Sequence, residues 1–320
     1  MSNALRTSLT ALAVLLVLAL CGLVLPTWLV FLLISAFAKG LTALGLVLLL
    51  RGGLLSFGQG LFYCAGGYGA GLLMLWGGVS DASLLVAAGG LVALILGLII
   101  APLLASYRGI FFATLTLALS MLLYGSLAKT DAIGGTDGLN LSPPTFFGYQ
   151  PDSSDGAVYA LYLYTCVVIV IFGFAFHHHF KSVRGLLSIA AHDNEIRVEY
   201  LGLSVRRLVM ENFVAAAFLG GVGGALNAMA IAHIDPELAF WTTSGELTFV
   251  AVLGGPFSVS AAFVSSVLIE LIRSISSMYF PNAWQMALGI FMLGSILFLP
   301  KGISGLFERL RSSFARRGRS

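Results

Sequence analysis

The chain has 320 residues, of which 58% are hydrophobic and 10% charged, and its mean hydropathy is +0.98. A soluble domain carries about 25% charged residues, so this composition excludes an ordinary soluble protein. Positive charge gathers in a loop at 177–207 and a tail at 301–320, where it is better explained as a membrane topology signal than as a nucleic-acid surface.

Apolar segments of ~20 residues recur along the whole sequence, which predicts an all-α, polytopic transmembrane helical bundle of about 8–10 membrane segments. We expect residues 1–320 to form a single membrane-spanning domain. The predicted apolar segments are 8–25, 29–50, 60–76, 83–105, 110–128, 158–176, 208–232, 246–275 and 284–300.

The positions of the basic residues predict the orientation of these segments. With the N-terminus inside, alternating crossings place Arg51, Arg108 and Lys181 inside and 129–157 outside, in agreement with the positive-inside rule. The tail at 301–320 is also expected to be cytoplasmic.

A first helix interruption is predicted at 51–60, because four glycines in ten residues sustain a helix poorly. Ser56 and Gln59 lie in this stretch and are candidates for the translocation pathway. Gly-rich interruptions in both halves of a transporter often mark its binding region. The glycines assigned to this break are Gly52, Gly53 and Gly58.

The polar loop at 177–207 lies between apolar segments and must therefore lie outside the lipid. Its hydrophobic periodicity predicts one amphipathic helix over 186–201, with Ser188 as its N-cap and Gly202 in a left-handed conformation after its last turn. Glu195 and Glu199 repel each other mildly unless a partner supplies cations. We predict a docking surface for a soluble partner, and the alternative is a helix lying on the inner leaflet. Its candidate residues are Ile189, Asp193, Glu195, Ile196, Glu199, Tyr200 and Gly202.

The long segment 246–275 contains Gly254, Gly255 and Pro256 near its middle. Proline removes a backbone donor and two glycines loosen the chain, so we predict a broken-helix hairpin that turns here. The alternative is a single kinked span, which would place the basic tail outside.

Three polar residues at membrane depth are further candidates for the pathway: Lys39, Asn227 and Glu246. An unpaired lysine inside a span costs about 3 kcal/mol or more. Lys39 therefore contacts a substrate carboxylate, forms a structural ion pair, or faces a wet crevice. Glu270 and Arg273 are three apart and are expected to pair.

Four stretches resemble, in order, the LivM-like permeases of the branched-chain amino acid ABC transporter family. Residues 190–202 resemble the coupling segment, 53–59 the Gly-Leu-Leu-Ser-Leu-Gly-His run, 134–139 the Gly-Gly-Thr-Asp-Gly-Leu loop, and 244–255 the Ser-Gly-Glu to Leu-Gly-Gly segment. His192 stands where the family has arginine, and Gln59 where it has histidine.

The resemblance implies a permease subunit of an ABC importer in the bacterial inner membrane. It implies pairing with a second, related permease, two cytoplasmic ATPases docked on the coupling segments, and a periplasmic substrate-binding protein. ATP would bind to the ATPases, and we expect no catalytic residue, metal or cofactor in this chain. The implied cargo is a branched-chain amino acid or a similar small polar solute, and permeases for urea and short amides look similar.

Two other classes of protein remain as alternatives. A stand-alone secondary carrier would need coupling-ion residues inside the membrane, and no mid-span pair of Asp or Glu is evident. A membrane-embedded enzyme would need clustered His, Asp or Ser at membrane depth, and none is evident. ATP-dependent uptake would distinguish the importer from both.

Overall fold

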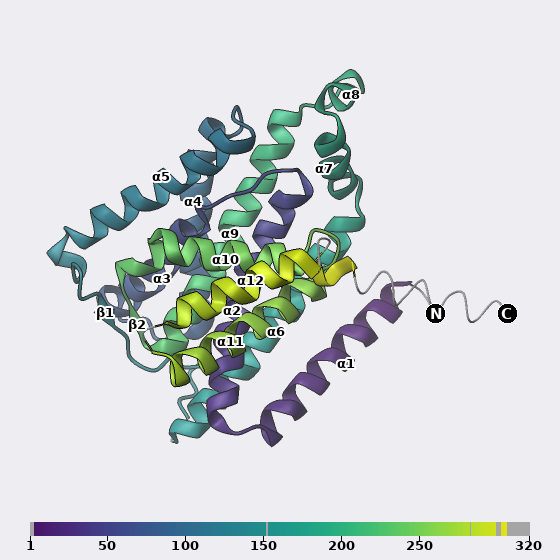
Figure 1. Ribbon diagram of the computed structural model, residues 1–320. Helices are drawn as coiled ribbons and strands as arrows, with labels where there is room; N and C mark the ends of the chain where they lie inside the picture. The colour runs from purple at the N-terminus through teal and green to yellow at the C-terminus, as the bar shows by residue number, and fades with distance from the viewer. Residues whose placement is uncertain (1–2, 152, 282, 299–301, 306–320) are drawn as a thin grey trace.

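The computed structural model describes residues 3–151, 153–281, 283–298 and 302–305. These residues form a bundle of α-helices with one two-stranded sheet (Figure 1). Six described helices are long and apolar enough to cross a membrane, and two shorter apolar stretches, Thr10–Val24 and Trp284–Ser295, accompany them. An all-α polytopic bundle is therefore confirmed.

In chain order the first half contains the helices α1 (Asn3–Val24), α2 (Thr27–Arg51), α3 (Gln59–Gly77), α4 (Ala82–Leu104), α5 (Gly109–Ala128), η1 (Asp131–Ile133) and strand β1 (Leu139–Asn140). The second half contains α6 (Ser154–Lys181), α7 (Val183–Asp193), α8 (Glu195–Tyr200), α9 (Val205–Ile231), β2 (His233–Ile234), η2 (Pro236–Ala239), α10 (Trp241–Gly254), α11 (Val259–Tyr279) and α12 (Trp284–Phe298).

Helix α9 is the centre of the bundle and packs against α2, α3 and α4. Close approach explains the glycines on this helix. A Cβ at Gly221 would collide with the backbone of Gly89, and one at Gly224 with the carbonyl oxygen of Tyr63. Small residues let helix backbones meet in lipid, where packing rather than the hydrophobic effect holds helices together.

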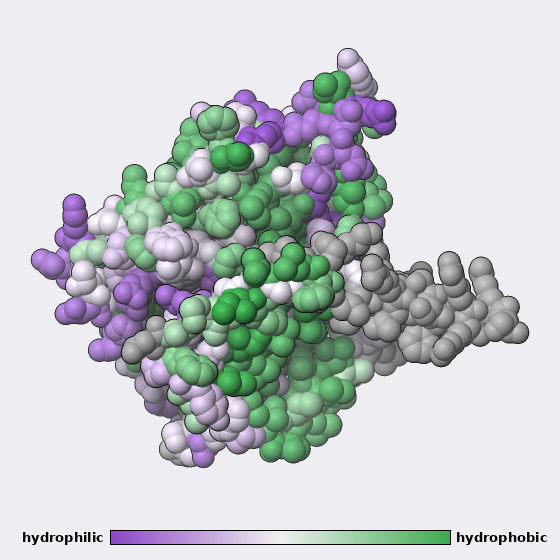
Figure 2. All heavy atoms as spheres, viewed as in Figure 1, coloured by the Kyte–Doolittle hydropathy of each residue, from purple (hydrophilic) through white to green (hydrophobic). Residues whose placement is uncertain are grey.

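One end of the bundle carries Arg51, the last turn of α6, the start of α7 and the turn between α10 and α11, and we call it the Arg51 end. Strands β1 and β2 pair antiparallel at the opposite end. Hydrophilic residues, with a few apolar ones among them, gather over α7 and α8, and others lie near β1, while apolar residues cover much of the surface between these two regions (Figure 2). The polar surfaces thus lie at the two ends, as a membrane-spanning bundle requires.

The segment predicted as a single apolar run at 246–275 is a hairpin of two antiparallel helices. Helix α10 ends at Gly254, Gly255 has φ +78°, and α11 begins at Val259. The Ser265 hydroxyl donates to the Val250 carbonyl oxygen at 2.8 Å and joins the two arms. The predicted break at Gly254, Gly255 and Pro256 is confirmed, and the kinked single span is wrong.

The prediction for the basic tail falls mostly outside the described residues, since only 302–305 of 301–320 are described. Gly302 lies against the hairpin turn, where a Cβ would meet the Leu253 carbonyl oxygen and the Gly255 nitrogen. The described start of the tail therefore lies at the Arg51 end, on the same side of the bundle as Arg51 and the end of α6.

Candidate functional site

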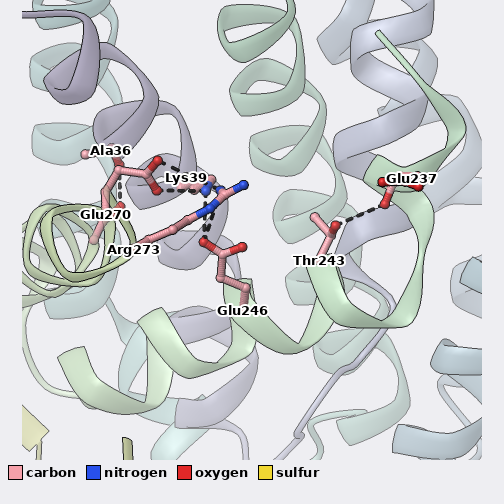
Figure 3. Close-up of polar contacts among 8 residues, drawn as sticks. Ala36, Lys39, Glu237, Thr243, Glu246, Glu270 and Arg273 are labelled. Atoms are coloured by element: carbon pink, nitrogen blue, oxygen red, sulfur yellow. Dashed lines mark hydrogen bonds and ion pairs between the residues drawn. The ribbon is translucent and has the colours of Figure 1, made fainter. Parts of the chain in front are cut away.

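A network of four charged side chains joins α2 to both arms of the hairpin (Figure 3), and three of them, Lys39, Glu246 and Glu270, are at most 14% exposed. The Lys39 ammonium, at the centre of α2, lies 2.9 Å from Glu246 Oε1 of α10 and 2.7 Å from Glu270 Oε2 of α11. Arg273 of α11 lies 3.4 Å from Glu246 and 3.9 Å from Glu270. Two cations and two carboxylates thus neutralise each other at membrane depth.

This network assigns Lys39 to an ion pair within the chain. Its side chain is only 7% exposed. The expected Glu270–Arg273 pair is present, but Lys39 is the closer partner of Glu270. Removing one member would leave a buried charge without compensation, which is far more costly than the intact network.

Tyr63 of α3 extends the polar interior around the network. Its side chain is fully buried, its hydroxyl has no hydrogen-bond partner among the described residues, and it lies close enough to Glu246, Glu270 and Arg273 to be affected by their charges. A tyrosine in an apolar run carries no sequence signal for such a position, and for that reason sequence analysis did not select it.

The first predicted helix interruption lies against the first arm of the hairpin. Thr248 of α10 donates to the Ser56 carbonyl oxygen at 3.0 Å, and the Gly60 backbone N–H donates to Ser244 Oγ at 3.1 Å. Residues 52–58 separate α2 from α3, and Gly53 has φ +71°. Gly52, Gly53 and Gly58 therefore lie in a true break, which packs against the first arm of the hairpin.

Gln59 and Asn227 are both buried but do not join the charge network by any hydrogen bond. Gln59 Nε2 donates to the Ala216 carbonyl oxygen at 2.6 Å, which ties the start of α3 to α9. Gln59 Oε1 and Asn227 Oδ1 have no hydrogen-bond partner among the described residues. Both oxygens are acceptors inside the bundle, so both residues stay pathway candidates.

The polar loop forms two short helices instead of the predicted single helix over 186–201. Helix α7 ends at Asp193 and α8 begins at Glu195, because Asn194 is extended (φ −163°) and its side chain accepts the Arg197 N–H at 3.0 Å. Asparagine favours such caps over helix interiors. The single-helix prediction was wrong because it gave the hydrophobic periodicity more weight than this cap signal.

The predicted N-cap of this loop was also wrong. The side chain of Ser182, not Ser188, caps α7 by accepting the Gly185 N–H. Ser188 is buried inside α7, where its hydroxyl accepts from Asn212 Nδ2 of α9 at 2.9 Å. Gly202 has φ +81° after the last turn of α8, as predicted.

Most candidate coupling residues are exposed, as docking requires. Ile196 and Tyr200 are 62% and 86% exposed, Asp193 and Glu199 are exposed, and Ile189 is half-buried. Glu195 differs, because Arg108 at the start of α5 lies 2.6 Å from its carboxylate. The cation that relieves the Glu195–Glu199 repulsion is therefore supplied by this chain.

Together, the apolar helices, the interrupted helices and the buried charges define a multi-pass helical membrane protein. A family model described as "Branched-chain amino acid transport system / permease component" matches residues 28–297, and the chain belongs to this permease family. Family membership and the six apolar helices make it a multi-pass protein of the inner membrane, in a family of transport permeases.

Curated relatives agree with this assignment. The chain is 28% identical over 274 residues to the high-affinity branched-chain amino acid transport system permease protein LivM of Escherichia coli (strain K12), and the match covers 78% of this chain and 64% of that relative. LivM of Salmonella typhimurium matches equally well. The permease protein LivH of Escherichia coli (strain K12) is 27% identical over 106 residues, or 33% of this chain and 34% of its own length.

The chain thus spans about 64% of the length of its LivM relatives. No solved structure matches it.

Proposed function

We propose that this chain is a permease subunit of an ATP-driven importer of branched-chain amino acids or a similar small polar solute. It pairs with a second, related permease, takes substrate from a periplasmic binding protein, and is driven by two cytoplasmic ATPases that bind the ATP. The chain itself is not an enzyme, and the Arg51 end faces the cytoplasm.

The α7–α8 segment is the observation that carries this proposal. It projects from the bundle at the Arg51 end (Figure 1) and combines exposed charge with exposed apolar side chains. Tyr200 and Leu201 are 86% and 75% exposed beside the exposed carboxylate of Glu199. Aromatic and aliphatic anchors ringed by polar groups are typical of a protein interface.

Contacts inside the chain allow a force on this segment to reach the bundle. The Ser188–Asn212 hydrogen bond joins α7 to α9. His192 lies directly against Gly53, since a Cβ on that glycine would collide with the imidazole. A docked ATPase that moved α7 would therefore act on α9 and on the first helix break, which supports alternating access without covalent chemistry in this chain.

The first test is purification of the tagged chain from its native membranes in mild detergent, with co-purifying proteins identified by mass spectrometry. We expect a second polytopic permease and ATPases with a phosphate-binding loop. In the same assay, Glu199→Lys should insert normally but lose the ATPases. Glu237→Lys, which reverses an exposed carboxylate of η2 outside the α7–α8 segment, should keep them. Equal ATPase recovery in both variants would contradict the docking surface.

A stand-alone secondary carrier is the second candidate, and one observation favours it. Sequence analysis identified no mid-span acidic pair, but Glu246 and Glu270 both contact Lys39 inside the bundle. Sequence analysis did not recognise them as a pair because they lie on opposite arms of the hairpin. Buried carboxylates are typical of ion-coupled carriers. Uptake that follows an imposed ion gradient without ATP would support the carrier, and ATP-dependent uptake would exclude it.

The cargo is tested separately by competition. If the implied class of solute is right, excess leucine, isoleucine or valine should suppress uptake of labelled leucine, whereas urea and acetamide should not. Suppression by urea or acetamide alone, with labelled urea as the substrate, would identify the short-amide permease instead.

A further inference from the structure

Arg51, the last residue of α2, binds three segments that are distant in sequence. Its Nη1 donates to the Pro256 carbonyl oxygen in the hairpin turn at 3.0 Å. Its Nη2 donates to the carbonyl oxygens of Phe180 at 3.2 Å and Gly185 at 3.4 Å, in the last turn of α6 and the first turn of α7. The guanidinium carbon also lies 4.3 Å from the Phe180 ring centroid.

The chemistry of these contacts makes Arg51 difficult to replace. The carbonyl oxygens at the end of α6 have no partner within the helix and need an external donor. A planar guanidinium offers five donors in a rigid fork and stacks on aromatic rings, whereas a lysine ammonium is a compact point charge. Arg51 is only 6% exposed, so these charge-assisted bonds form away from bulk water.

Arg51 also connects the two regions considered above. Its contact with Gly185 lies in the first turn of α7, the first helix of the proposed docking segment. Its contact with Pro256 lies on the hairpin, whose arms bear Glu246 and Glu270. Lys39 holds those arms to the same helix, α2, roughly three turns away. The hairpin thus contacts α2 at two places, through Arg51 at the hairpin turn and through Lys39 along its arms. Arg51 also joins α7 to the hairpin turn.

We infer that Arg51 is the positioning residue that transmits displacement of α7 to the α10–α11 hairpin, and so links the ATPase surface to the interrupted helices. This inference rests on the proposed function. The Nε–H of Arg51 has no acceptor among the described residues. This donor is therefore available to form a hydrogen bond when α7 or the hairpin turn moves.

The test uses the complete transporter, co-purified with its permease and ATPase partners and reconstituted in vesicles with its binding protein. Arg51→Met removes the fork and the charge. We expect the complex to assemble and basal ATP hydrolysis to persist, while ATP-driven uptake and stimulation by loaded binding protein fall about tenfold. Arg51→Lys should give an intermediate loss, because lysine keeps the charge without the fork.

Arg207→Met is the matched control. It removes a positive charge at the same end, but Arg207 is 80% exposed at its side chain and forms an ion pair with Glu211, one turn away on the same helix. Uptake by this variant should stay within about twofold of the unchanged protein. An assembled Arg51→Met complex with unchanged uptake would overturn the inference.

If Arg51→Met fails to assemble, distance measurements on Arg51→Lys decide the question. Spin labels at the exposed positions Val183 and Phe257, with Cys21 replaced by serine, report the separation of α7 from the hairpin. The unchanged transporter should keep one narrow distance when ATP binds, because the two move together. In Arg51→Lys the distance distribution should broaden or shift when ATP binds. An unchanged narrow distribution would contradict the inference that Arg51 transmits the displacement of α7 to the hairpin.

These outcomes are separable from failure of the proposed function. If the unchanged chain recovers no ATPase, or takes up its solute without ATP, the importer proposal fails before any Arg51 variant is compared. If the unchanged transporter is ATP-driven and the Arg51 variants behave like it, only the inference about Arg51 fails.

Discussion

The buried charges between α2 and the hairpin and the exposed charges around α7–α8 are of the same chemical types but have opposite consequences. Lys39 and Glu246 are less than 10% exposed at their side chains, whereas Arg108 and Glu195 are 32% and 42% exposed. The Arg108–Glu195 contact is even the shorter of the two, at 2.6 Å against 2.9 Å. Burial, not distance, therefore decides how much stability is lost when one partner of a pair is removed, because water screens the exposed pair and is excluded from the buried one.

The largest expected effect follows from Lys39→Met, which leaves Glu246 and Glu270 without their shared ammonium. Losing one partner of a buried network costs about 3–5 kcal/mol. Thermal unfolding of the purified protein in detergent should show a clear loss of stability. The double variant Lys39→Met with Glu270→Gln removes one stranded carboxylate and should recover part of it, since Arg273 still contacts Glu246. No recovery would mean that packing of the lysine chain, and not charge, dominates.

A smaller effect is expected from Gly255→Val at the hairpin turn. Gly255 has φ +78° and ψ 166°, a conformation that is nearly restricted to glycine and costs other residues about 1–3 kcal/mol. The unfolding midpoint should fall less than in Lys39→Met. Gly125→Val is a suitable control, because a Cβ at Gly125 meets open space and its φ is helical. Equal midpoints for the two variants would show that the turn is not strained.

Asn194→Ala should act locally on the exposed segment. Loss of an N-cap costs about 1 kcal/mol of helix stability. Amide hydrogen exchange should therefore speed up in α8, while the unfolding midpoint of the whole protein stays nearly unchanged. A large global loss would contradict the view that α7–α8 is only weakly coupled to bundle stability.

The smallest effect is expected from Glu195→Gln. An exposed ion pair contributes about 0–1 kcal/mol and is screened by salt, so the difference from the unchanged protein should vanish at high ionic strength. Stability measured at low and high salt checks this. A loss of stability that persists in high salt would show that the Arg108–Glu195 pair is not screened by water, and would contradict the contrast drawn here between exposed and buried ion pairs.

Local signals in the sequence were enough to predict the membrane-length helices, the two helix breaks and the family. Each of these signals acts on neighbouring residues and can be recognised in a short stretch of sequence. They are the apolar runs of membrane length, the Gly-Gly-Pro interruption and the glycines at 52–58. The cap at Asn194 was equally local and could have been found, since an asparagine followed by glutamate is a helix-start pattern.

The partners of the charged residues were decided only by the tertiary structure. Lys39 lies 207 residues from Glu246 and 231 from Glu270 along the chain, and Arg51 lies 129 residues from Phe180 and 205 from Pro256. The sequence by itself determined that a lysine inside a span needs compensation, because its desolvation is costly wherever its partner comes from. Which carboxylates compensate it, and which carbonyls Arg51 binds, depended on how α2, α6, α10 and α11 pack, and no local pattern encodes that packing.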